Sequence, residues 1–95
     1  MPTVIMKGTI TLYFAVGPTM TAAATVQAEQ LGADWTCVVT AQLESHVYEG
    51  GFRISSDSGR QATELEAGLQ RTIETWPDPW ALALSAKVLL RKVSE

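Results

Sequence analysis

The sequence is poor in the residues that most often carry out chemistry. Its 95 residues include one cysteine and one histidine. One cysteine cannot form an intrachain disulfide, and this pair cannot build a closed zinc site without carboxylates. The spacings typical of a P-loop, a zinc-protease helix, a paired-cysteine motif and a serine nucleophile turn are also missing. We therefore expect no catalytic residue, no metal site and no cofactor.

Positive charge and long apolar runs are equally scarce. Seven Lys and Arg against ten Asp and Glu give a formal net charge of −3, which argues against nonspecific binding to nucleic acid or to an anionic membrane surface. No apolar run approaches the roughly 18 residues that cross a bilayer. The N-terminus also lacks the basic start and apolar stretch of a signal peptide. We expect a cytoplasmic protein with neither nucleic acid nor membrane as a partner.

What is present is typical of a folded globular protein. The hydrophobic fraction is 46% and the charged fraction 18%, and residues 1–95 are expected to form a single α+β domain. Alternate residues over positions 4–16 are apolar, which predicts a half-buried strand. Residues 19–31 are rich in alanine and lie between a Gly-Pro pair and a glycine, which predicts a short helix.

The middle of the chain predicts a hairpin followed by a helix. Alternation over residues 35–43 and 47–55 indicates two strands joined near Ser45 and His46, with Val39 opposite Phe52. Ser58 stands three residues before Gln61, as in a capping box, and apolar residues then recur every three or four positions up to Trp76.

The last segment decides the expected fold. Over residues 80–91 helix-forming residue types are common, but apolar and polar positions alternate with a period of two. This pattern predicts a strand paired antiparallel with the first. The order becomes β-α-β-β-α-β, a ferredoxin-like fold with a four-stranded antiparallel sheet, two helices on one face, and the first and third strands central.

The predicted order is similar to that of RNA-recognition motifs, amino-acid-sensing regulatory domains and dimeric α+β barrels. Residues 38–76 also resemble double-stranded-RNA-binding domains and small antitoxins. RNA binding is not implied, because Arg60, Gln61 and Glu64 stand where such domains carry a lysine cluster. The third strand likewise has Glu49, Gly51 and Arg53 on the face where an RNA-recognition motif displays stacking aromatics.

The predicted core combines one parity of each strand with the apolar side of the second helix. Its members are Ile10, Leu12, Phe14, Val39, Phe52, Ile54, Leu65, Leu69, Ile73, Leu84 and Val88.

Function is expected on the sheet face that the helices leave open. Basic and aromatic side chains of the outer parity could hold a small anionic ligand there: Lys7, Tyr13, Arg53, Lys87 and Arg91. The rest of that face mixes apolar and hydroxyl residues, so we expect a homo-oligomer that uses the face or a sheet edge. The favoured function is a small non-catalytic binding or assembly module.

The alternative is a small enzyme of the dimeric α+β barrel type with a pocket on the same face. Its acid–base groups would come from Tyr13, His46, Glu49 and Arg53. Cys37 and His46 are not expected to act together, because Cys37 has the buried parity and His46 lies at the hairpin end.

Overall fold

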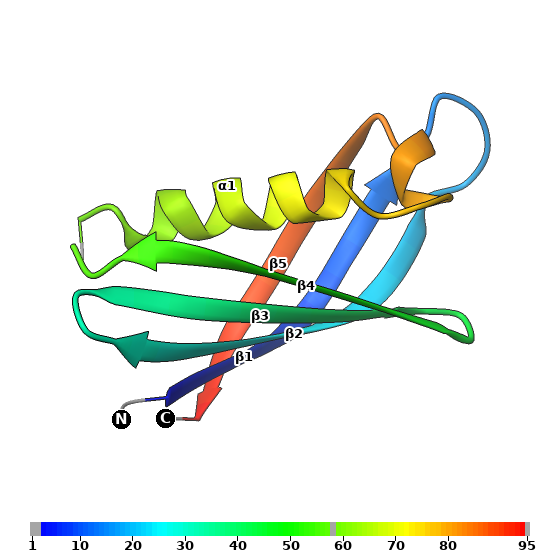
Figure 1. Ribbon diagram of the computed structural model, residues 1–95. Coiled ribbons are helices and arrows are strands. Elements are labelled where there is room, and N and C mark those ends of the chain that lie inside the picture. Colours follow the sequence, from blue (N-terminus) through cyan, green and yellow to red (C-terminus); the bar gives the residue numbers. More distant parts are fainter. Residues whose placement is uncertain (1–2, 58, 95) are drawn as a thin grey trace.

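The computed structural model describes residues 3–57 and 59–94, which form one antiparallel sheet of five strands with a single α-helix against it (Figure 1). The strand order is β4-β3-β2-β1-β5. The elements are, in chain order, β1 (Thr3–Tyr13), β2 (Met20–Leu31), β3 (Asp34–Leu43), β4 (His46–Ser55), α1 (Gln61–Glu74), a 3-10 helix η1 (Trp80–Leu82) and β5 (Ser85–Ser94). The protein is thus a small α+β structure, and the predicted ferredoxin-like fold with four strands and two helices is wrong.

The error lies mainly in residues 19–31, which form a strand and not a helix. β2 pairs antiparallel with both β1 and β3 over most of its length. Its side chains alternate between the two faces, with Ala22, Ala24, Val26 and Ala28 all buried. The helix propensity of alanine is overridden because two long neighbouring strands satisfy the backbone hydrogen bonds of β2.

The β3–β4 hairpin is present, but its register differs from the predicted one by two residues. Leu43 pairs with His46 across a turn at Glu44 and Ser45, and Glu44 has a φ of 58°. Cys37 therefore lies opposite Phe52. Because the shift is an even number, every side chain keeps its predicted face.

The last strand was predicted correctly in type and partner. β5 pairs antiparallel with β1, with Thr9 opposite Leu89 and Lys7 opposite Arg91. Its start was wrong, because Trp80–Leu82 form η1. With this segment outside the sheet, Leu84 is 73% exposed and not part of the core.

The core lies between α1 and the concave face of the sheet, here called the inner face. Of the predicted core, Ile10, Leu12, Val39, Ile54, Leu69 and Ile73 are buried, while Phe14, Phe52, Leu65 and Val88 are half-buried. α1 begins at Gln61 after Arg60, which caps it with no side-chain hydrogen bond. The predicted cap, Ser58, lies outside the described residues.

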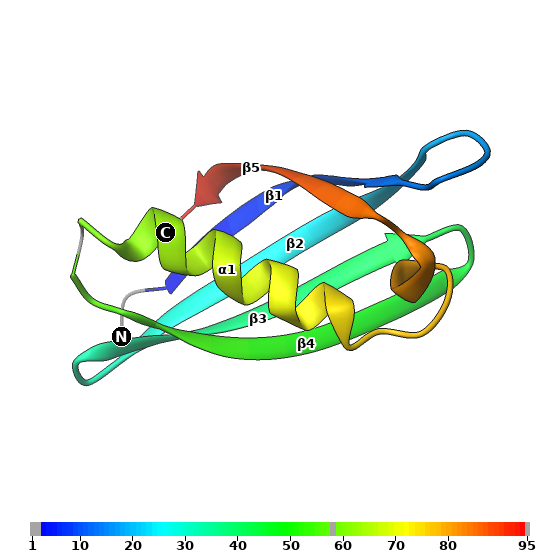
Figure 2. The same cartoon turned by 90° about the horizontal axis from the view of Figure 1, so that it is seen from above.

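α1 packs on the β4 side of the sheet (Figure 2). α1 can lie close to β4 because each element has a glycine at the contact. A side chain at Gly50 of β4 would overlap Thr72 of α1, and one at Gly68 of α1 would overlap the Phe52 ring of β4. The chain after α1 adds an aromatic cluster in which the Trp76 and Trp80 rings meet edge to face at 4.7 Å between centroids. Tyr48 joins this cluster, so η1 is held beside β4 as well.

Candidate functional site

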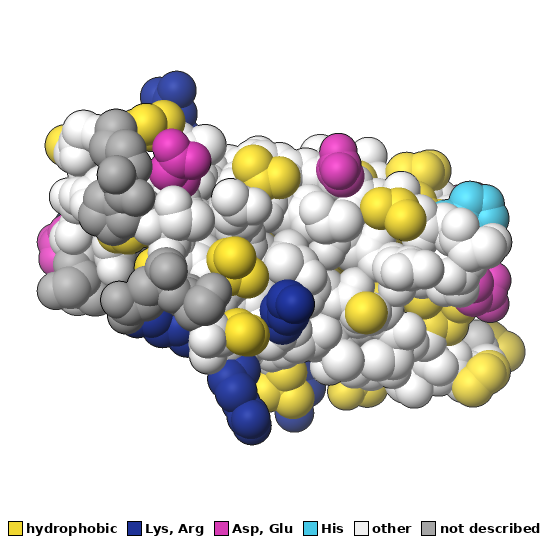
Figure 3. Space-filling model, turned by 90° about the horizontal axis from the view of Figure 1, so that it is seen from below, with side chains coloured by type: hydrophobic (Ala, Val, Ile, Leu, Met, Phe, Trp, Pro, Cys, Tyr) yellow, Lys and Arg dark blue, Asp and Glu magenta, His cyan; other side chains and the backbone are white. Residues whose placement is uncertain are grey.

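The sheet face opposite α1, here called the outer face, has no helix packed against it among the described residues. Figure 3 shows it as mostly uncharged, with most basic side chains toward the β5 edge, one more at the opposite edge, and acidic ones mainly along that opposite edge and the ends. Several large apolar side chains are exposed on it, among them Val38 at 48%, Val47 at 59% and Leu89 at 62%.

The structure brings two of the five predicted ligand residues directly together and places a third on the same two strands. Lys7 on β1 lies directly opposite Arg91 on β5, and Lys87 lies on the same face opposite Thr11, four pairs further along the same strands, which is roughly 13 Å away. We call Lys7, Lys87 and Arg91 the basic patch. A shallow hollow of about 480 Å3 beside Lys7 and Arg91 opens there.

Tyr13 and Arg53 stand apart from the centre of this patch. Tyr13 lies at the end of β1, opposite Ser85. Arg53 is on β4, opposite Thr36 of β3, so β2 and β3 separate it from β1. β4 and β1 are three strand spacings apart, which places the backbone of Arg53 roughly 14 Å from β1.

Charge is graded across the outer face in one row of cross-strand neighbours. The row runs Arg91, Lys7, Thr25, Thr40, Glu49 from β5 to β4. The basic end therefore has two like charges directly opposite each other, an unfavourable arrangement in isolation. The acidic end has one carboxylate roughly 14 Å from Lys7, with two hydroxyl side chains between them.

The residues of the enzyme alternative do not converge. Tyr13 lies on β1, whereas Glu49 and Arg53 lie on β4 with two strands between. His46 is exposed at the β3–β4 hairpin and its ring is 6.4 Å from that of Tyr48. Cys37 is buried on the inner face, and burial raises the pKa of its thiol to about 11. No nucleophile–base pair results from these positions.

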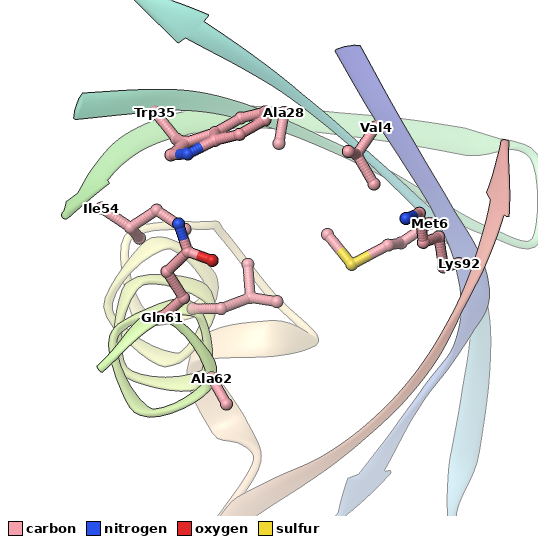
Figure 4. A pocket seen from close by; sticks show the side chains of 9 residues that line it. Val4, Met6, Ala28, Trp35, Ile54, Gln61, Ala62 and Lys92 are labelled. Carbon is pink, nitrogen blue, oxygen red and sulfur yellow. The ribbon is translucent and has the colours of Figure 1, made fainter. Parts of the chain in front are cut away.

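A separate apolar pocket of about 270 Å3 lies at the start of α1, between Trp35 and Met6 (Figure 4). Its walls are mainly apolar, and the side-chain carbonyl of Gln61 points into it (Figure 4). The Gln61 amide nitrogen donates a hydrogen bond of 3.2 Å to the Ser55 carbonyl. The sequence did not reveal this pocket, because its wall on β2 was expected to be a helix.

A groove between α1 and β5 was also missed. It encloses about 620 Å3 and is lined by Thr63, Glu66, Ala67 and Gln70 of α1 and by Ala86, Lys87 and Val88 of β5. Periodicity places Ala86 and Val88 on the inner face, but it cannot show that α1 lies toward β4 and leaves them half-covered.

Comparison with known proteins gave no match to a family model, a curated protein or a solved structure. Within residues 3–57 and 59–94, no helix has the length and apolar character needed to cross a membrane. Over the same residues, no three His, Cys, Asp or Glu side chains gather in a way that could hold a metal ion.

Proposed function

We propose that the protein is a small non-catalytic assembly module that forms a homodimer through its outer face. The observation that carries the proposal is the charge gradient of the row from Arg91 and Lys7 to Glu49. A row of side chains that is basic at one end and acidic at the other is complementary to the same row of a second copy related by a twofold axis.

The dimer has a twofold axis parallel to the strands and centred between β2 and β3. Rotation about this axis places β4 of one copy across β1 of the other, with β5 of that copy just beyond it. The Glu49 carboxylate then faces the Lys7–Arg91 pair of its partner, and the same contact repeats on the other side. The anion offsets the repulsion between the two cations. In the free protein the basic patch binds small carboxylates or phosphates in the same way.

A charge-swap experiment tests this arrangement. Glu49→Lys places three cations in each contact, and the double variant Lys7→Glu with Arg91→Glu places three carboxylates there. Each variant alone is expected to sediment as a monomer. An equimolar mixture is expected to regain the dimer, because every contact then pairs opposite charges.

Arg53→Glu is the matched control, since it reverses one charge of the same face outside this row. It should leave the dimer largely intact. Two charge-swap variants that each still dimerise alone, or a mixture that stays monomeric, would contradict the arrangement.

A further inference from the structure

We infer that β5 is a docking edge for an extended segment of another protein, in which acidic residues alternate with apolar ones. The segment adds a sixth strand to the five-stranded sheet and fills the groove beside α1. This inference goes beyond the proposed homodimer, because it concerns a sheet edge and the inner groove and not the outer face.

The two edges of the sheet are unequal. At β4, side chains of α1 and of the turn after it satisfy three backbone groups by hydrogen bonding. The Ser55 amide donates to Glu64 Oε2 at 2.8 Å, the Ser55 carbonyl accepts from Gln61 Nε2, and the Glu49 carbonyl accepts from Trp76 Nε1 at 3.0 Å. Backbone groups satisfied in this way are poor partners for a further strand.

At β5 the situation is different. Among the described residues β5 has β1 as its one strand partner. Over residues 85–91, the side of β5 away from β1 therefore offers backbone donors and acceptors to a further strand, which is the template that strand addition uses.

Space for the side chains of an added strand exists beside β5. The groove of about 620 Å3 has Ala86 and Val88 on one wall and Ala67 on the other. Apolar side chains pointing inward from the added strand would cover these half-exposed surfaces. An acidic inward side chain is unfavourable, because Glu66 of α1 also lines the groove.

The charges of β5 favour acidic residues at the outward-facing positions of the added strand. β5 carries Lys87, Arg91 and Lys92 and no acidic residue. Lys87 and Arg91 face outward, so a neighbouring strand meets them with every second side chain. Acidic residues at those positions complement them. A second copy of β5 does not, because it would bring the outward-facing Lys87 and Arg91 of both copies together without an acidic residue from either β5.

The probe for this edge is a fluorescein-labelled peptide of alternating glutamate and valine, as long as β5. Its binding is measured by fluorescence anisotropy, and amide hydrogen exchange is followed by NMR. We expect saturable binding that protects every second β5 amide, since these amides acquire new hydrogen bonds. A glutamine–valine peptide is expected to bind several-fold more weakly.

Two variants locate the site. Lys87→Glu should weaken the glutamate–valine peptide several-fold. Ala67→Leu fills the groove and should do the same, whereas Ala23→Leu, which adds the same atoms on exposed β2 surface, should leave affinity unchanged.

Binding without protection of β5 amides would overturn the inference, and so would protection that appears in the peptide-free protein as its concentration rises. The second result would assign the edge to another copy of this chain. Sedimentation of the same samples reports the outer-face dimer separately, so failure of one proposal leaves the other testable.

Discussion

At the residue scale, Cys37 links burial to the pH dependence of stability. Its side chain is fully buried on β3, and desolvation raises the pKa of the thiol from 9.0 to about 11. Between these values the unfolded chain releases a proton that the folded chain retains. The contribution of the protonated Cys37 thiol to the free energy of unfolding is therefore complete below pH 9. It falls by about 2–3 kcal/mol as the pH rises toward 11.

We expect the free energies of unfolding of the parent protein and of Cys37→Ala to converge as the pH rises. Cys37→Ala is less stable than the parent at about pH 8, because a buried side chain is shortened. The difference should shrink as the pH approaches about 10.5, because the variant has no thiol to titrate. Urea unfolding at both pH values measures it, and parallel pH profiles would show that the thiol does not titrate with a raised pKa.

Gly8 lies where the β5 backbone leaves no room for a side chain on β1. A Cβ at this position would overlap the backbone carbonyl of Leu89, which cannot move without separating the two strands. We expect Gly8→Ala to lower the free energy of unfolding by about 1–3 kcal/mol. Urea midpoints measure the change.

Gly51→Ala is the control for that substitution. A Cβ at Gly51 would lie 3.4 Å from the Cys37 carbonyl oxygen, an ordinary contact, and its φ does not require glycine. Replacement is expected to be neutral or to stabilise by up to about 1 kcal/mol, because glycine is unfavourable within a strand. Equal losses at both glycines would refute a special role for Gly8.

At the element scale, the sequence predicted strands well where two residue classes alternate and failed where most residues are small. β1, β3, β4 and β5 combine branched or aromatic residues with polar ones. β2 alternates too, with Ala22, Ala24 and Val26 on the inner face, but Ala23 on the outer face weakens the contrast. Long-range pairing with β1 and β3 makes this segment a strand, and local propensity does not report such pairing.

In the candidate site, too, features that depend on strand alternation were predicted and features that depend on long-range packing were not. Antiparallel pairing of the first and last strands was enough to place Lys7 and Arg91 side by side. The distance of Arg53 from them depends on β2 lying within the sheet, which the expected helix concealed. The groove could not be predicted, because it depends on how far α1 leans toward β4, set by contacts at Gly50 and Gly68.

The attachment of α1 to the sheet gives the third prediction. Leu69 is 1% exposed and faces the inner side. Leu69→Ala is expected to cost about 2–5 kcal/mol, since it removes buried apolar surface and leaves a cavity. Leu89→Ala makes the same chemical change on the outer face, at a residue that is 62% exposed, and should cost well under about 1 kcal/mol in the monomer. Thermal unfolding of both variants checks this, and an unchanged melting temperature for Leu69→Ala would remove it from the core.

At the scale of the whole molecule, shape determines whether the outer face can support a dimer. The principal extents are 43 × 22 × 19 Å, so the protein is elongated. A face of the first two dimensions has a footprint of roughly 900 Å2. Covering somewhat more than half of it on each copy reaches the roughly 1,000 Å2 in total that a specific interface needs.

The last prediction is that the protein sediments as a homodimer or a higher oligomer at tens of micromolar and that charges placed on the outer face abolish this. Val38 lies on β3 near the expected axis, and Tyr13 lies on β1 of the same face; they are 48% and 40% exposed. Val38→Asp and Tyr13→Asp should each give monomers, because a carboxylate would be buried there without a partner. Val16→Asp, at a loop residue that is 88% exposed, adds the same charge outside the sheet and should leave the oligomer intact. An oligomer that survives both sheet substitutions must use another surface. A parent protein that stays monomeric would leave the outer face free for a different partner, to which the basic patch contributes its charge.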